Sequence, residues 1–213
     1  MRKVSSVLLV LVLISFMSAV GFAADRPLIA FSQVAMNHPW RIAMTNDIVY
    51  WAEKLGVDLI WNEGEADAAI QLTKVRDLLL QEPDALIMSP FQATALDPVK
   101  EMCDEAGIPL VTIDRSIDSE PGTGMYISFI GKDNTRIARE LGEFVANYLY
   151  ELNGEYKGNI VEIQEAVGSS ATIERYNGFR EAIAEYPDIN IIATQSGHGY
   201  RVEGTKVMEN YLE

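Results

Sequence analysis

Short apolar runs alternate with longer segments of helical period along this chain from residue 27 onward. The runs that read as strands lie at 28–34, 57–61, 85–88, 110–113 and 125–130. Between them the apolar residues recur on one helical face, as at Met44, Ile48 and Leu55. Strands that are joined through helices run parallel and have right-handed crossovers. The pattern therefore predicts an α/β fold in which helices cover both faces of a parallel sheet.

A second series of the same kind follows residue 131, with helices expected at 137–148, 173–183 and 201–212 and strands at 159–164 and 189–194. No Pro/Ser-rich linker divides the two series, so the extended stretch 129–134 is the candidate hinge. We expect two doubly wound parallel-sheet lobes, a first at 24–131 and a second at 132–213. Two strands make a poor sheet, so the second lobe is expected to be incomplete and the chain to be the front part of a longer protein.

The first residues have the three-part layout of a secretory signal peptide. Arg2 and Lys3 precede an apolar run at 7–20, and small residues follow it up to Ala23. The run is short for a membrane span, which makes an uncleaved anchor the less favoured alternative. We expect a signal peptide at 1–23 that is cleaved after Ala23, and export to the periplasm.

The chain is strongly acidic, with 31 Asp and Glu against 17 Lys and Arg and a formal charge of -14. Removing Arg2 and Lys3 with the signal peptide leaves 15 basic against 31 acidic residues, a formal charge of -16. Nucleic acid and anionic membrane surfaces are therefore not expected as partners. The single cysteine, Cys103, excludes an internal disulfide, so the core must be stable without one.

Polar and aromatic residues follow the strands at the edge where open α/β sheets bind ligands. After the first strand, "NHPWRIA" places Pro39 in the first turn of a helix and Trp40 and Arg41 directly behind it. After the fourth strand come Asp114 and Arg115. A carboxylate and a guanidinium can hold sugar hydroxyls, and an aromatic face can cover the C–H face of a sugar ring. The structural alternatives are a strand-end ion pair, a core-capping Trp40 and a solvated Arg41; the four residues together favour a ligand clamp.

The loop "VGSSATIERYNGF" follows a strand of the second series. Gly168, Ser169 and Ser170 can cap the helix that carries Arg175, which faces either the cleft or the solvent. The Gly-Lys-Ser/Thr ending of a phosphate-binding P-loop is missing. Asp133 and Asn134 are expected to cap the helix that begins near Thr135.

Motifs of common enzymes are absent from the sequence. No G-x-G-x-x-G follows the first strand, no G-x-S-x-G is present, and His38 and His198 are not clustered with Cys or carboxylates at metal spacing. We expect no cofactor, no metal site and no catalytic residue.

The segments "IAFSQV", "PWR", "IPLVTIDRSID", "KDN" and "VGSSATIERYNGFREAI", in this order, resemble the periplasmic sugar-binding proteins of ABC importers. The "PWR" and "DRSID" segments are more similar to the galactofuranose-binding branch than to the ribose-binding branch. The resemblance implies the type I solute-binding fold, a monosaccharide held between two lobes, and delivery to a membrane permease by a monomer that is not an enzyme. A chemotaxis or sensor-kinase receptor and, less favoured, a secreted sugar-active enzyme are the alternatives; the export signal and negative charge argue against a transcription repressor.

The resemblance also implies roles for individual residues. Trp40 would pack on the sugar, and Tyr200 would lie beside the pocket. Hydroxyls of the sugar would be bound by Arg41, Asp114 and Arg115 from the first lobe and by Arg175 from the second. Glu165 departs from the small residue that the family has at its position, and His38 from an Asn. We expect Asp114→Ala to abolish binding by leaving Arg115 without a partner, and the isolated segment to bind sugar poorly.

Overall fold

The computed structural model of the protein describes residues 26–213, so the expected signal peptide lies outside the described residues. A five-stranded sheet has the order β2-β1-β3-β4-β5, and all its strand pairs are parallel. Its strands are β1 (Leu28–Gln33), β2 (Asp58–Glu63), β3 (Ala85–Met88), β4 (Leu110–Ile113) and β5 (Tyr126–Ile130). The α/β class and the parallel sheet predicted from the apolar runs are confirmed.

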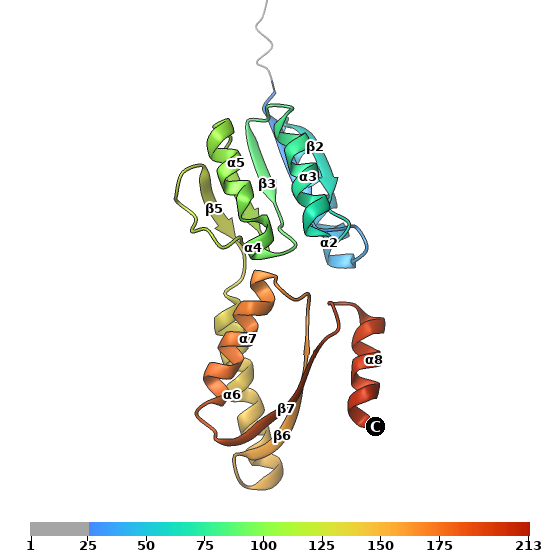
Figure 1. The fold of residues 1–213 in the computed structure, drawn as a ribbon, viewed down its shortest axis with the longest axis vertical. Helices are drawn as coiled ribbons and strands as arrows, with labels where there is room; N and C mark the ends of the chain where they lie inside the picture. Colours follow the sequence, from blue (N-terminus) through green and yellow to red (C-terminus); the bar gives the residue numbers. More distant parts are fainter. Residues whose placement is uncertain (1–25) are drawn as a thin grey trace, which may run out of the picture.

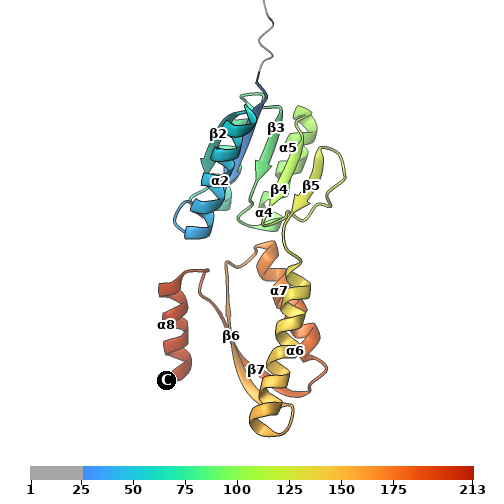
Figure 2. The ribbon, with the colours of Figure 1, turned by 180° about the vertical axis from the view of Figure 1, so that it is seen from behind.

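Helices lie on both faces of this sheet, and we call the sheet and its helices the first lobe. The helices are α2 (Pro39–Leu55), α3 (Ala68–Leu79), α4 (Ala93–Leu96) and α5 (Pro98–Ala106). Figure 1 shows α3 and α5 on one face, and Figure 2 shows α2 on the other. Since α2 is the one helix drawn on that face among the described residues, it covers β1 and β2 and leaves β4 and β5 without a helix in front of them.

The second lobe, as we use the term, contains α6 (Asn134–Asn153), β6 (Lys157–Gln164), α7 (Ser170–Ile183), β7 (Asp188–Ser196) and α8 (Arg201–Leu212). Strands β6 and β7 form a two-stranded parallel sheet. Helices α6 and α7 pack on one face of this sheet, and α8 lies on the other (Figure 1). In the described part of the chain, each of these strands therefore has one edge without a neighbouring strand.

Local sequence sets where α2, α6 and α7 begin. At α2, Pro39 occupies the first turn and His38 Nδ1 accepts a hydrogen bond of 3.2 Å from Trp40 N. Asp133 caps α6 by accepting from Arg136 N at 2.9 Å, and Ser169 caps α7 by accepting from Thr172 N. The caps predicted at Asp133 and Ser169 are thus present.

The two lobes have hydrophobic cores of different size. The first core lies between the five-stranded sheet and α3, α4 and α5, and its fully buried side chains include Leu86, Met88, Leu110 and Tyr126. The second is small, with Ala146, Ile183 and Ile189 at its centre. Because buried apolar area is the main source of stability, the first lobe is expected to be the more stable of the two.

One covalent crossing joins the lobes within the described residues, at 131–133 between β5 and α6. On the same side, the loop between β6 and α7 touches the first lobe through hydrogen bonds. Ala93 N donates to Gly168 O at 2.9 Å, Gln92 Nε2 to Val167 O at 3.2 Å, and Ser116 N to Ser170 Oγ at 2.9 Å. These contacts hold the carboxyl ends of the two sheets against each other.

Gly168 is required by this contact. Its φ of +82° lies in the left-handed region, and a Cβ at this position would lie 3.2 Å from Gln92 Nε2. A larger residue would strain the backbone of the loop and require the Gln92 side chain to shift.

Candidate functional site

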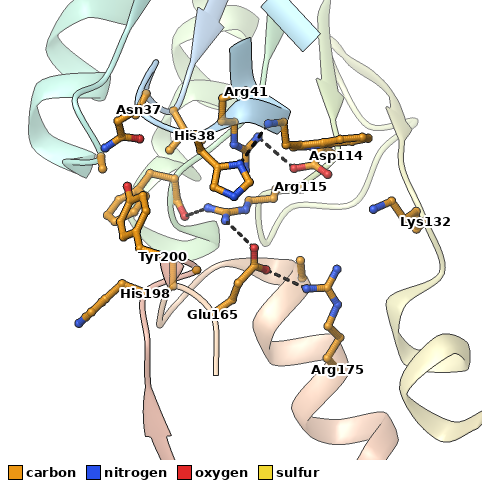
Figure 3. Close-up of a pocket in the computed structure, with 18 residues that line it drawn as sticks. Asn37, His38, Arg41, Asp114, Arg115, Lys132, Glu165, Arg175, His198 and Tyr200 are labelled. Atoms are coloured by element: carbon orange, nitrogen blue, oxygen red, sulfur yellow. Dashed lines mark hydrogen bonds and ion pairs between the residues drawn. The ribbon is translucent and has the colours of Figure 1, made fainter. Parts of the chain in front are cut away.

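A cavity of about 150 Å³ lies between the lobes, at the carboxyl ends of both sheets. Residues of both lobes line it, and Figure 3 shows their side chains converging from above and below. The residues singled out from the sequence all lie on its wall: Trp40, Arg41, Asp114, Arg115, Arg175 and Tyr200. The structure thus brings together side chains that are up to 160 positions apart in the chain.

Arg41 is buried and paired with Asp114. Its side chain is 7 % exposed, and Nη1 lies 3.0 Å from Asp114 Oδ2. The same Nη1 donates to Ser89 Oγ at 2.7 Å and approaches Gln33 Oε1 at 3.5 Å. The solvated first-turn position considered for Arg41 is therefore wrong, because the guanidinium turns inward from α2.

The ion pair also corrects the expected partner of Asp114. Sequence adjacency suggested a pair with Arg115, whereas the carboxylate contacts Arg41, which is 73 positions away. The reason is the backbone at Asp114, which has a left-handed φ of +64°. This turn directs Asp114 and Arg115 to different partners, and Asp tolerates the conformation better than most residues because its side chain is short and polar.

Arg115 is equally buried but has fewer partners. Its Nη1 donates to Phe91 O at 3.1 Å, and its Nη2 lies 3.9 Å from Glu165 Oε1 of the second lobe. Burial, followed by the nearby Arg41 charge, lowers the pKa of Arg115 to about 10, so the side chain remains cationic at neutral pH. Burial also lowers the pKa of Arg41, an effect that Asp114 opposes. The floor of the cavity therefore carries two buried cations beside one carboxylate.

The second lobe contributes an acid and a base that face this floor. Arg175 Nη1 donates to Glu165 Oε2 at 2.8 Å, and Arg175 Nε donates to Asn134 Oδ1 at 3.1 Å. Asn134 is 2 % exposed and lies directly after the crossing between the lobes. Of the two orientations left open for Arg175, the structure has the one toward the cleft.

Aromatic side chains border the opening of the cavity. Trp40 is 48 % exposed, so it does not cap the core, and Lys132 Nζ lies 4.9 Å from its ring centroid. Tyr200 lies at the start of α8, with its ring 6.5 Å from that of His38. An exposed indole face beside hydrogen-bonding groups is suited to a ring that has one apolar face.

Residues 26–213 contain no group of His, Cys, Asp and Glu side chains that could hold a metal ion. None of the described helices is long and apolar enough to cross a membrane.

Several residues of the site were missed or left undecided from the sequence. Glu165 and His38 line the cavity, although their roles were left open, and Lys132 and His198 also lie on its wall. Ser89 and Asn134 position the arginines; Ser89 was not predicted from the sequence, and Asn134 was predicted only as a helix cap. The signal for Ser89 was its place directly after β3 (Ala85–Met88), at the same sheet edge as the other polar residues.

The chain is similar in sequence to two sugar-binding proteins. The galactofuranose-binding protein of Escherichia coli K12 is 36% identical over 197 residues, which cover 92% of this chain and 60% of that protein. The ribose import binding protein of the same organism is 28% identical over 212 residues, covering 100% of this chain and 68% of that one. The chain therefore spans about 60% of the length of the first of these relatives.

Solved structures agree with these relatives. A crystal structure of a galactofuranose binding protein has a TM-score of 0.78 at 36% identity, covering 87% of this chain and 61% of that one. The fructose-binding periplasmic domain of a hybrid two-component system has a TM-score of 0.78 at 30% identity, covering 88% and 59%. The sequence profile described as "Periplasmic binding protein domain" matches residues 29–213. This chain belongs to the periplasmic binding protein family.

Proposed function

We propose that the protein is a periplasmic receptor that captures a monosaccharide between its two lobes and delivers it to the permease of an ABC importer. The observation that carries the proposal is the cavity itself, because residues of both lobes converge on one space that has charged side chains on its wall and aromatic side chains at its rim. The relatives named as galactofuranose-binding and ribose import binding proteins support a sugar as the ligand. The lobes would move as units, 24–131 and 132–213, about the crossing between them.

Each predicted residue has a role that its position supports. Arg41, Arg115 and Arg175 donate hydrogen bonds to sugar hydroxyls, and Asp114 accepts hydrogen bonds from sugar hydroxyls. Trp40 covers the apolar face of the sugar ring, and Tyr200 closes the side of the pocket. The cavity of about 150 Å³ is small beside the roughly 300–1,000 Å³ of sites for drug-sized ligands, which favours a single sugar ring over an oligosaccharide.

Receptor function requires no chemistry on the ligand. A ligand closes the lobes only as far as it binds the closed form better than the open form. We therefore expect a labelled sugar to be recovered unchanged after incubation with the protein. Release of a new product would instead support the sugar-active enzyme.

We also propose that the protein is exported and that it acts as a monomer. The signal peptide at 1–23, cleaved after Ala23, takes the protein to the periplasm, where relatives of this family are found. The acidic surface makes nucleic acid an unsuitable partner.

A screen of monosaccharides tests the function. The full-length gene product is mixed with D-ribose, L-arabinose, D-galactose or D-fructose, and its unfolding temperature is measured. A ligand at about 100 times its Kd stabilises the native state by roughly 2.7 kcal/mol, which gives a clear rise in the unfolding temperature. By the same relation, about 10 mM sugar gives this rise for a Kd of about 0.1 mM, so an unchanged unfolding temperature with every sugar at that concentration would contradict the proposal.

A sensory role is the second candidate, because the fructose-binding domain of a two-component system has the same fold at a TM-score of 0.78. Both roles begin with the same binding event. Deleting the gene of this protein separates them: transport predicts loss of sugar uptake, whereas sensing predicts loss of the transcriptional response to the sugar while uptake persists.

A further inference from the structure

Glu165 lies between two arginines that come from different lobes. Its Oε2 accepts a hydrogen bond of 2.8 Å from Arg175 Nη1 in the second lobe, and its Oε1 lies 3.9 Å from Arg115 Nη2 in the first. Every other ion pair found among residues 26–213 joins groups of one lobe. Glu165 therefore makes the one ion pair between the lobes in the described part of the chain.

The position of Glu165 allows it to act on closure. It follows β6 directly and begins the segment that accepts the inter-lobe hydrogen bonds, through the carbonyl oxygens of Val167 and Gly168 and the hydroxyl of Ser170. The side chain is 39 % exposed and lies on the wall of the cavity, so it occupies space that a ligand would enter (Figure 3).

Arg115 needs an acceptor from this side. Its guanidinium is buried and donates one hydrogen bond within the protein, to Phe91 O. The positive charge of Arg41 is close enough to disfavour the charged form of Arg115. Buried cations are costly unless they are paired. Glu165 supplies a carboxylate that partly compensates Arg115.

The contact continues to the crossing between the lobes. Arg175 holds Glu165 with Nη1 and contacts Asn134 with Nε, and Asn134 Nδ2 in turn donates to Glu174 Oε2 at 2.9 Å. Since Asn134 follows the crossing at 131–133, a connected set of polar contacts runs from the first lobe through the cleft to the hinge.

We propose that Glu165 is an electrostatic latch that holds the empty cleft closed and competes with the ligand for Arg115. A ligand hydroxyl that accepts from Arg115 takes the place of the carboxylate, which then remains on Arg175. The latched form is a competitor of the bound form, so it weakens the apparent affinity. If about nine empty molecules in ten are latched, the apparent affinity falls roughly tenfold. The competition with ligand rests on the proposed function, whereas the closing of the empty cleft does not.

Pulsed EPR measures the latch without ligand. Spin labels are attached to cysteines introduced at Asp47 in α2 and Lys206 in α8, which are both exposed. The two helices lie on the side opposite the crossing (Figure 1). The native Cys103 is buried and stays unlabelled. Glu165→Gln keeps the size of the side chain and removes its charge. Glu181→Gln is the matched control, because Glu181 forms an exposed ion pair of 2.6 Å with Arg139 inside the second lobe.

The expected result is a longer mean distance, with a larger open population, for Glu165→Gln and an unchanged distribution for Glu181→Gln. Circular dichroism verifies that each variant is folded. Salt provides a test that needs no Glu165 variant, since raising NaCl from 0.01 to 1 M shortens the screening length from about 30 to about 3 Å and should open the labelled parent protein. Identical distributions for the parent and Glu165→Gln would overturn the latch.

Calorimetry with the tightest sugar of the screen completes the experiment. Glu165→Gln is expected to bind several-fold more tightly than the parent. If no sugar binds but the EPR distances still shift, the proposed function fails and the closure by Glu165 stands. If the parent binds sugar and Glu165→Gln changes neither distance nor affinity, the latch fails and the proposed function stands.

Discussion

Replacing Asp114 tests how the first lobe supports the cleft, because this carboxylate is the ion-pair partner of the buried Arg41. Removing one member of a buried pair costs about 3–5 kcal/mol, mostly because the other charge is left unpaired. Arg41 keeps its hydrogen bonds to Ser89 Oγ and Gln33 Oε1, and Asp114 is 15 % exposed, so the lower end of that range applies. We expect Asp114→Gly to lower the free energy of unfolding by about 3 kcal/mol.

Two further substitutions separate charge from backbone. Asp114→Asn keeps an acceptor and tolerates the left-handed φ of +64°, so it loses only the charge assistance of the hydrogen bond, about 1–1.5 kcal/mol. Asp114→Ala loses the carboxylate and also forces Ala into the left-handed region, which adds about 1 kcal/mol to the cost of the Gly variant. The expected order of stability is therefore Asp, Asn, Gly and Ala.

Urea unfolding followed by tryptophan fluorescence measures this order. All three tryptophans, Trp40, Trp51 and Trp61, belong to the first lobe and report on its unfolding. With a slope of about 2 kcal/mol per M, the midpoint should fall by roughly 0.5–0.8 M for the Asn variant and roughly 2 M for the Ala variant. Equal midpoints for the parent and all variants would show that the Arg41–Asp114 pair does not stabilise the lobe. An Ala variant as stable as the Gly variant would refute the backbone part of the reasoning.

Three other predictions follow from single positions. Trp40→Ala should change the free energy of unfolding by less than about 0.5 kcal/mol, since the ring is 48 % exposed, but should weaken sugar binding at least tenfold; unchanged affinity in calorimetry would remove Trp40 from the site. Gly178→Ala should destabilise the second lobe by about 1–3 kcal/mol, because the new Cβ would collide with the backbone carbonyl of Thr135; thermal melting by circular dichroism measures this, and an unchanged melt would contradict the close packing of α6 and α7. Burial, with a smaller contribution from Asp104, raises the pKa of the Cys103 thiol to about 12, so the native thiol should react far more slowly with a thiol reagent than the unfolded one. The stability that this thiol contributes is complete below about pH 8.5, the usual value of an unfolded thiol, and is lost as the pH rises toward 12; a native thiol that reacts as fast as the unfolded one would contradict the burial.

The strands and helices were largely predictable from the sequence because their signals are local. The strands Ala85–Met88 and Leu110–Ile113 and the helix Arg201–Leu212 have the expected bounds, since each apolar run or period ends at a clear polar or turn residue. The strand predicted at 159–164 begins earlier, at Lys157, because β7 pairs with its first residues although they carry no apolar signal. Pairing with a neighbouring strand thus extended the element beyond its own sequence pattern.

The membership of the site was also predictable, whereas its internal contacts were not. Parallel strands bring their carboxyl ends to one edge, which is enough to place Arg41 near Asp114 and Arg115. Which arginine pairs with Asp114 depends on the left-handed backbone of Asp114 and on the burial of the Arg41 side chain, and neither has a local sequence signal. The contacts of Glu165 depend on how the two lobes meet, so they could not be predicted from either lobe alone.

The loop between β6 and α7, which contacts the first lobe, has a consequence for protein engineering. Its contacts with the first lobe use the carbonyl oxygens of Val167 and Gly168 and the hydroxyl of Ser170, whereas the cavity wall consists of neighbouring side chains such as Trp40 and Glu165. Apart from Glu165, the contacts that hold the lobes together therefore use mainly backbone atoms, whereas ligand preference depends on side chains. A library that randomises the rest of the wall while fixing Glu165 and 167–170 keeps the contacts between the lobes, which is the property required of a scaffold for small-molecule biosensors.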